Sequence, residues 1–251
     1  MTEDTERVFA VRFGFNPQRN AWTLRVLPLE AWTDDQRADW VALVQDAFIH
    51  LAVVGGLCGQ HGDPSASAFA GEVEVWEVDD CVEWRFGVLR IDPASVSLLL
   101  NLCEWATLNI APAVMVEVLV PFPLTDEAED RPLPQRCARL SFPVEEAGQE
   151  GERLSIQIEL VEKLTGPHVS LISGLVRPWQ LAVLREGFAL TTLPAGESEV
   201  RLADPPMVIV DDQWSMNFEV FFARYEAVDV FLNCLERIHQ TVCRVKTVSI
   251  E

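Results

Sequence analysis

The sequence predicts an α+β protein made of two similar halves, on three observations. First, the stretch VDDCVEWRFGVLRIDPASVSLLLNLCE (Val78–Glu104) aligns without a gap with VDDQWSMNFEVFFARYEAVDVFLNCLE (Val210–Glu236). Second, in both halves the period-two alternation of half-buried strands gives way to the apolar periodicity of helices. Third, a proline-rich acidic stretch separates the copies. Identical pairs include Asp79/Asp211, Asp80/Asp212, Phe86/Phe218, Val88/Val220, Val96/Val228, Leu100/Leu232, Asn101/Asn233 and Glu104/Glu236.

The first half opens with two expected strands and a helix. VFAVRFGF (Val8–Phe15) and WTLRVLPL (Trp22–Leu29) flank Asn16–Asn20, whose composition favours a turn, so we expect a hairpin. Thr33 is then expected to cap a helix that ends at Gly55-Gly56. The apolar stripe that this helix turns toward a sheet consists of Trp40, Leu43, Val44, Ala47, Phe48 and Leu51.

A second hairpin, a helix and a strand complete this half. GEVEVWEV and CVEWRFGVLRI alternate on either side of Asp79-Asp80, which predicts a hairpin with an acidic turn. Asp92-Pro93 is a typical helix start, and the following helix, Ala94–Leu108, is apolar on most of its circumference. After Pro112, the β-branched run AVMVEVLV indicates a last strand.

The domain boundaries follow from residues 123–136, an acidic segment rich in proline that we interpret as a linker between residues 1–122 and 137–251. The second half repeats the order of the first: RLSFPV and LSIQIELV as a hairpin, a helix after Gly166-Pro167, a hairpin about Asp211-Asp212, a helix Glu226–Gln240 and the strand CRVKTVSI. Two departures are expected, a helix broken in two at Pro178 and an acidic insertion, Glu145–Glu152, in the first hairpin.

The order of elements specifies the fold class further. Without its extra leading strand, each half reads strand-helix-strand-strand-helix-strand, which is the order of a ferredoxin-like split βαβ unit. The sequence therefore predicts an α+β protein of two tandem ferredoxin-like halves that arose by internal duplication, each with an extra N-terminal strand.

Composition and charge limit the cellular compartments and the classes of partner that the sequence favours. The N-terminus begins with acidic residues rather than the positive start of a secretory signal, no run of about 18 apolar residues predicts a membrane span, and we expect a cytoplasmic protein. The net charge of −20 repels nucleic acid and anionic membranes and favours a basic protein partner, although acidity also serves solubility alone. The cysteines lack disulfide-framework or zinc spacing and are expected to be reduced: Cys58, Cys81, Cys103, Cys137, Cys234 and Cys243.

Features that occur in both halves are best explained by the fold that the halves share. The pairs Asp79-Asp80 and Asp211-Asp212 could be carboxylate ligands of a metal ion, but their place between alternating segments favours turn formation. The repeated Asn101/Asn233 and Glu104/Glu236 are expected to bond locally or to face water.

Features present in one half are candidates for specific function. The loop from Cys58 to Asp63 combines the Cys58 thiol, the His61 imidazole and the Asp63 carboxylate, which could form a nucleophile or one arm of a metal site, or only a surface loop. Common cofactor, phosphate and nucleophile motifs are missing, so we predict no cofactor, no metal and no catalytic residues.

A second one-sided feature is acidity near the junction of the halves. We predict that these carboxylates bind a basic partner, mainly by raising the association rate; a solvated linker and loop is the alternative. The residues are Asp126, Glu127, Glu129, Asp130, Glu145, Glu146, Glu150 and Glu152.

Two resemblances bear on function. In topology the tandem arrangement resembles the CRISPR-associated RNA endonucleases, but the negative charge argues against an RNA groove. As a whole, the acidic α+β chain without a catalytic motif resembles bacterial immunity proteins, such as those protecting against type VI secreted effectors. That resemblance implies a cytoplasmic, non-catalytic inhibitor that occludes a cationic toxin; the alternatives are a small enzyme or metal-dependent factor using Cys58, His61 and Asp63, and an adaptor bridging partners through its two halves.

Overall fold

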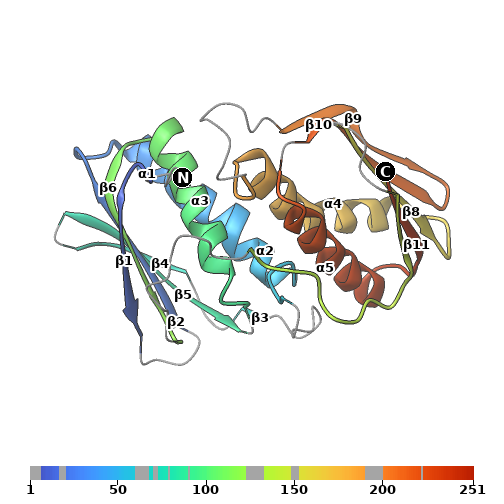
Figure 1. The fold of residues 1–251 in the computed structure, drawn as a ribbon, viewed down its shortest axis with the longest axis horizontal. Helices are drawn as coiled ribbons and strands as arrows, with labels where there is room; N and C mark the ends of the chain where they lie inside the picture. The colour runs from blue at the N-terminus through green and yellow to red at the C-terminus, as the bar shows by residue number, and fades with distance from the viewer. Residues whose placement is uncertain are drawn as a thin grey trace, which may run out of the picture.

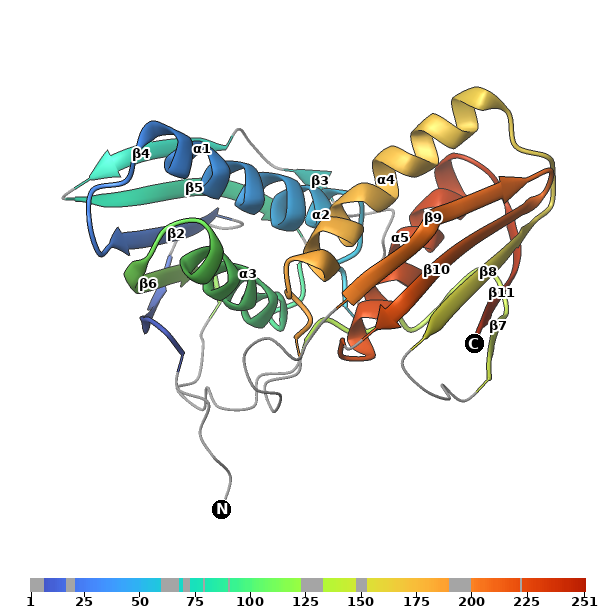
Figure 2. The same ribbon diagram turned by 90° about the horizontal axis from the view of Figure 1, so that it is seen from above.

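A computed structural model describes residues 7–16, 21–59, 68–69, 73–78, 80–89, 91–122, 133–147, 153–189, 200–221 and 223–251. Two β-sheets lie at opposite ends of the long axis, and the helices of both halves fill the space between them (Figure 1). The view from above shows α2 of the first half next to α4 of the second, between the two sheets (Figure 2). The predicted α+β class with two similar halves is thus confirmed.

The sheet of the first half has the strand order β1-β6-β2-β5, and β3 and β4 both pair with β5. Its strands are β1 (Ala10–Phe15), β2 (Ala21–Pro28), β3 (Ala68–Phe69), β4 (Glu74–Val78), β5 (Cys81–Leu89) and β6 (Ala113–Val120). Its helices are α1 (Asp34–Leu43), the π-helix η1 (Val44–Ile49), α2 (His50–Val53) and α3 (Ser95–Asn109).

The sheet of the second half has the order β7-β11-β8-β10-β9, which repeats that of the first with β9 in place of β3 and β4. Its strands are β7 (Val144–Glu146), β8 (Leu154–Leu160), β9 (Val200–Val210), β10 (Gln213–Phe221) and β11 (Val245–Ile250). Its helices are α4 (Gly166–Leu184) and α5 (Glu226–Thr241).

The two leading hairpins predicted from the sequence are wrong. β1 pairs in parallel with β6, and β7 pairs in parallel with β11, so the last strand of each half lies between the first two. The reason is burial. In β6 every second residue from Val116 to Val120 is buried, which suits a strand with neighbours on both sides, whereas β1 and β7 are largely exposed and suit a sheet edge. Glu145 and Glu146 therefore belong to an edge strand and not to a hairpin loop.

The helices form close to where the sequence places them, with one exception. Thr33 and Gln36 make a reciprocal capping box at the start of α1. The predicted break at Pro178 is wrong, because α4 runs unbroken from Gly166 to Leu184. A break would divide a buried stripe that includes Val176 and Trp179, and burial of this stripe outweighs the roughly 3 kcal/mol cost of an interior proline. The matching helix of the first half, in contrast, is irregular at mid-length, where η1 interrupts it.

The two halves meet through these two helices, since α4 contacts both η1 and α2. A matched pair of glycines allows the close approach. A Cβ atom on Gly56 would lie 3.0 Å from Cys234 Sγ, and a Cβ atom on Gly187 would lie 3.2 Å from Leu102 Cδ2. Leu102 and Cys234 occupy the same position of the repeat, so each half presents a glycine to the equivalent helix of the other.

The repeated asparagines cross this boundary. Asn101 Nδ2 donates to Gly187 O at 3.0 Å, and Asn233 Nδ2 donates to Gly56 O at 3.1 Å. Each side chain also accepts a hydrogen bond from the segment leading into its own half, from Arg7 Nη2 at 2.8 Å and from Cys137 N at 2.7 Å respectively. The expectation that the asparagines bond locally or face water is therefore wrong: they join the two halves.

The repeated glutamates act three residues further along the same helices. Glu104 Oε2 accepts from Arg7 Nη1 at 2.8 Å, while Glu236 accepts from the backbone N and the hydroxyl of Ser141, at 2.7 and 2.6 Å. In both halves the Asn-x-x-Glu spacing thus holds the segment before the first strand in place.

Within the described ranges, no helix combines the length and the apolarity that crossing a bilayer requires.

Candidate functional site

One row of side chains crosses the outer face of the first sheet, which is the face turned away from the helices. Strand register places Trp76 of β4 opposite Glu83 of β5, Glu83 opposite Arg25 of β2, Arg25 opposite Glu117 of β6, and Glu117 opposite Arg12 of β1. We call Trp76, Glu83, Arg25, Glu117 and Arg12 the charged row. Its charges alternate in sign, so neighbouring members attract one another.

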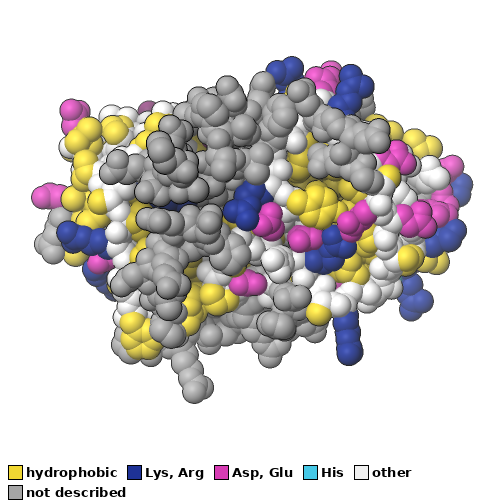
Figure 3. Space-filling view, viewed as in Figure 1, with side chains coloured by type: hydrophobic (Ala, Val, Ile, Leu, Met, Phe, Trp, Pro, Cys, Tyr) yellow, Lys and Arg dark blue, Asp and Glu magenta, His cyan; other side chains and the backbone are white. Residues whose placement is uncertain are grey.

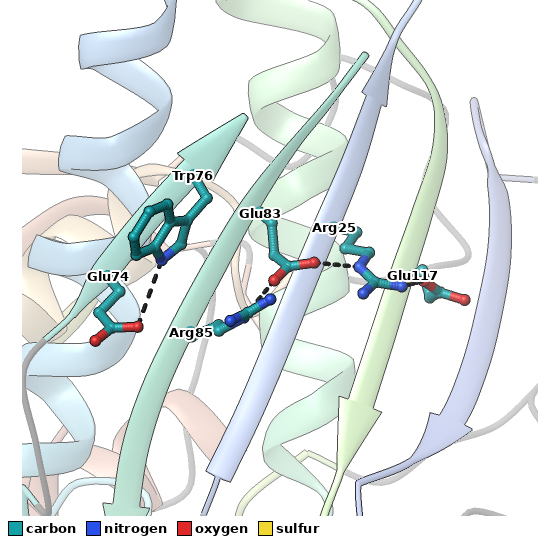
Figure 4. Close-up of polar contacts among 6 residues, drawn as sticks. All are labelled: Arg25, Glu74, Trp76, Glu83, Arg85 and Glu117. Carbon is teal, nitrogen blue, oxygen red and sulfur yellow. Dashed lines mark hydrogen bonds and ion pairs between the residues drawn. The ribbon is translucent and has the colours of Figure 1, made fainter. Parts of the chain in front are cut away.

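The Glu83 carboxylate is the centre of this row. Arg25 Nε donates to one of its oxygens and Arg85 Nε to the other, while Arg25 Nη1 donates to Glu117 Oε2 at 3.0 Å. Figure 4 shows these side chains together in front of the sheet, with the helices behind it. Glu83 is 0% exposed although it lies on the outer face, and Arg25 and Arg85 occupy both of its oxygens.

Electrostatics fixes the protonation state of the row. Burial alone would raise the pKa of Glu83, but the hydrogen bonds from Arg25 and Arg85 outweigh it and hold the pKa below the ordinary value. The bond to Glu83 is also the main reason why the pKa of Arg25 is raised. Glu83 is therefore an ionised carboxylate with both oxygens occupied. This arrangement suits a rigid recognition surface better than a general base, which needs a free oxygen and a pKa near 7.

The same row in the second sheet is chemically different. There the register places Val208 opposite Ser215, Ser215 opposite Gln157, Gln157 opposite Ser249, and Ser249 opposite Glu145. The fold is shared, so the replacement of an aromatic and four charged residues by mostly small neutral ones is not a requirement of the fold. The charged row is accordingly the clearest one-sided feature that the structure describes on a sheet face.

The strand β4 extends the row to the edge of the first sheet. All five of its residues are exposed, and Trp76 is 53% exposed. Trp76 Nε1 lies 3.4 Å from Glu74 Oε2, and on the opposite face of the strand Arg37 Nη2 of α1 bonds Glu77 Oε1 at 2.6 Å. The edge thus presents an indole between carboxylates.

Of the acidic residues predicted to bind a partner, Glu145 and Glu146 lie within the described residues. Glu145 is exposed on β7. Glu146 Oε1 is 2.6 Å from Arg136 Nη1, whose Nε also bonds Asp229 Oδ1 at 2.9 Å. Burial alone would raise the pKa of Glu146, but hydrogen bonds from Tyr225 and Arg136 hold it below the ordinary value. Glu146 is thus already paired with Arg136. On the face drawn in Figure 3, acidic and basic side chains of the second half lie next to one another.

The remaining six predicted acidic positions fall outside the described residues: Asp126, Glu127, Glu129, Asp130, Glu150 and Glu152. The end of the predicted linker is described, and it packs as part of the protein, since Leu133 and Pro134 are buried and Gln135 O accepts from Asn233 Nδ2 at 3.0 Å.

Cys58, the candidate nucleophile, lies at the junction of the halves. It is 5% exposed, and a hydrogen bond to the Cys137 thiol, followed by burial, raises the pKa of Cys58. A thiol in this setting stays protonated at neutral pH, unlike an activated nucleophile. Its proposed partners His61 and Asp63 lie outside the described residues.

The residues of the acidic pairs that the structure describes, Asp80, Asp211 and Asp212, lie in turns, as expected. Val78 pairs with Cys81 and Val210 pairs with Gln213, which closes a two-residue hairpin in each half. Asp80 and Asp211 have φ values of 66° and 56°, a left-handed conformation that aspartate tolerates. Asp79 is not among the described residues. Within the described ranges, no group of three or more His, Cys, Asp or Glu could hold a metal ion.

The charged row was missed in the sequence, although a signal for it exists. In the alignment of the two copies, Glu83 corresponds to Ser215 and Arg85 to Asn217, so the second copy lacks both charges. Glu117 could not be placed beside Arg25, because the predicted hairpin put β1 on the side of β2 that β6 occupies.

Comparisons with known proteins add no family. No protein-family model and no curated protein matches the chain. Among solved structures, the chain is similar to a putative M16-like peptidase from Alicyclobacillus acidocaldarius, with 9% identity, coverage of 94% of this chain and 78% of that chain, and a TM-score of 0.22. It is also similar to a conserved protein from Enterococcus faecalis V583, with 6% identity, coverage of 92% and 78%, and a TM-score of 0.18. At such TM-scores the likeness supports no statement about activity.

Proposed function

We propose that this chain is a non-catalytic protein-binding protein that takes a basic partner on its first half. The observation that carries the proposal is the charged row with its exposed Trp76, which the otherwise equivalent second sheet lacks. An indole that is half exposed gains free energy when a partner covers it, and tryptophan and arginine are enriched among the residues that dominate binding energy.

The rigidity of the row favours binding. Arg25 and Arg85 are held by Glu83 before any partner arrives, so little side-chain entropy is lost when they are covered. A guanidinium has five N–H donors, and Arg85 uses its Nε for Glu83. The terminal groups of Arg85 can therefore donate to carbonyl oxygens of a partner without breaking the bond to Glu83.

The charge of the partner follows from the surroundings of β4. Glu74 and Glu77 lie on the strand, Asp34 and Asp35 lie in the first turn of α1, which Arg37 joins to β4, and the net charge of the chain is −20. Such a field raises the association rate of a cation and repels nucleic acid.

At the level of the fold, we propose that each half is a ferredoxin-like unit and that the two arose by duplication. The order β6-β2-β5-β4, with each strand antiparallel to the next, supports this for the first half, as β11-β8-β10-β9 does for the second. The matched roles of Asn101 and Asn233 at the junction support a common origin.

Within the class of binding proteins, we propose an immunity protein that acts in the cytoplasm and occludes a cationic toxin. Toxins that act on nucleic acids need a basic surface, and an acidic blocker can occupy that surface in place of the polyanion. Two observations support this proposal: the net charge of −20, and the charged row with Trp76, which is present on the first sheet and not on the second.

Co-expression with the product of the neighbouring open reading frame tests this function. We expect the neighbour to be toxic alone, harmless beside this chain, and retained with it through purification at low ionic strength, with retention decreasing as salt is raised. A neighbour that is harmless alone and does not co-purify contradicts the proposal.

A further inference from the structure

We propose that the free edge of β4 is a strand-addition site, at which an extended segment of alternating apolar and basic residues from the partner pairs with β4 and extends the first sheet. The inference rests on the proposed function, because it specifies how the same face holds its basic partner. It requires an accessible edge, a reason to prefer that edge over the others, and side chains that select the segment.

The edge is accessible. In the part of the chain that the structure describes, β4 pairs with β5 alone, and its residues from Glu74 to Val78 are all exposed. An unpaired strand edge presents backbone N–H and C=O groups that a second strand can satisfy, which gives affinity without regard to sequence.

The corresponding edge of the second sheet is protected against such pairing. β9 carries Asp204-Pro205-Pro206 within the strand, and its pairing with β10 shifts register between Met216 and Phe218 and again before Val220. Proline has no N–H to donate and register shifts twist an edge away, which are devices that discourage an incoming strand. β4 contains neither proline nor a register shift in its pairing with β5.

The two opposite edges suit a basic segment less well. β1 carries Arg12, which repels a cationic strand, and β7 has only three residues, of which Glu146 is bound to Arg136. β4 instead offers Glu74 on its outer face, whereas Glu77, on the other face, is bound to Arg37.

Alternation along β4 specifies what the incoming strand carries. Glu74, Trp76 and Val78 lie on the outer face of β4, and Val75 and Glu77 lie on the other face. Because neighbouring residues of a strand point to opposite faces, the basic side chains of an alternating segment would lie beside Glu74 and over the Trp76 indole, and its apolar side chains would lie beside the exposed Val75. The acidic tip at Asp80 adds attraction at one end of the strand.

A short acetylated and amidated peptide of alternating lysine and valine is the probe, and amide hydrogen exchange is the measurement. We expect the peptide to protect the amides of β4, and an analogue N-methylated at successive residues, so that neither of its edges can donate, to bind at least about tenfold more weakly, because each lost main-chain hydrogen bond weakens binding. Glu74→Lys should weaken binding of the parent peptide as well, whereas Glu219→Lys, an exposed carboxylate of β10, should not.

The outcomes separate strand addition from the proposed function. Equal binding of the N-methylated analogue, protection at β1, β7 or β9 in place of β4, or no binding of the parent peptide would each overturn strand addition. If the basic partner nevertheless co-purifies, the proposed function stands without this mode of binding. If no basic protein is retained, the proposed function itself is lost.

Discussion

Replacing Asn233 with alanine is expected to lower the free energy of unfolding by about 3 kcal/mol, the largest effect of any polar substitution that we expect. Asn233 is 0% exposed and makes three hydrogen bonds, to Gly56 O at 3.1 Å, to Gln135 O at 3.0 Å and from Cys137 N at 2.7 Å. Alanine would leave a buried backbone N–H and two carbonyl oxygens without partners, in a place where water cannot easily replace the amide.

The repeat provides a matched control. Asn101 makes the equivalent bond to Gly187 O but is only partly buried, so Asn101→Ala should cost about 1 kcal/mol, since water can reach the groups it leaves. Urea unfolding of both variants, followed by tryptophan fluorescence and by circular dichroism, measures the difference. Equal losses, or a loss below about 0.5 kcal/mol for Asn233→Ala, would show that the junction is not held by this side chain.

Glu83→Gln should lower the free energy of unfolding by about 2 kcal/mol at neutral pH, and the difference from the wild type should decrease as the pH falls below the ordinary glutamate pKa. Glutamine has one acceptor oxygen for the two guanidinium groups that Glu83 satisfies, and its NH₂ group would face donors. The folded-state pKa of Glu83 is depressed, so its contribution is present above the unfolded pKa and is lost as pH falls through the folded value.

Unfolding curves at neutral pH and at about pH 3, below the ordinary glutamate pKa, test the sign. Glu117→Gln is the control, because Glu117 is more exposed and, within the described part of the chain, bonds Arg25 and no second arginine. Its effect at neutral pH should be smaller. A gap between Glu83→Gln and wild type that grows on acidification would contradict the depressed pKa.

Local patterns in the sequence predicted most of the elements, because each records a local cause. The Thr33 cap, the turns at Asp80 and Asp211, and the helix after Asp92 follow from neighbouring residues. The pairing of β1 with β6 could not be predicted in this way. It depends on which strand buries the most apolar surface when it occupies a central position in the sheet. Likewise, the local preference of Pro178 is overridden by the buried stripe of α4.

The candidate site was predictable in part. Comparing the two copies position by position already shows that Glu83 is not doubled. Joining Glu83 to Arg25 and Glu117 requires the strand order, because these residues come from three strands that are far apart in the sequence. The asparagine and glutamate pairs were interpreted as local because spacing on a helix does not show what the helix faces.

The most direct measurement of the central claim, that the partner binds where the halves differ, compares Trp76→Ala with Val208→Ala. Trp76 and Val208 occupy the same position of the repeat, opposite Glu83 and Ser215 respectively, and both are exposed. By isothermal titration calorimetry with the co-purified basic partner, Trp76→Ala should weaken binding at least about tenfold while Val208→Ala leaves it unchanged. Unchanged binding by Trp76→Ala, or an equal loss in both variants, would contradict the account.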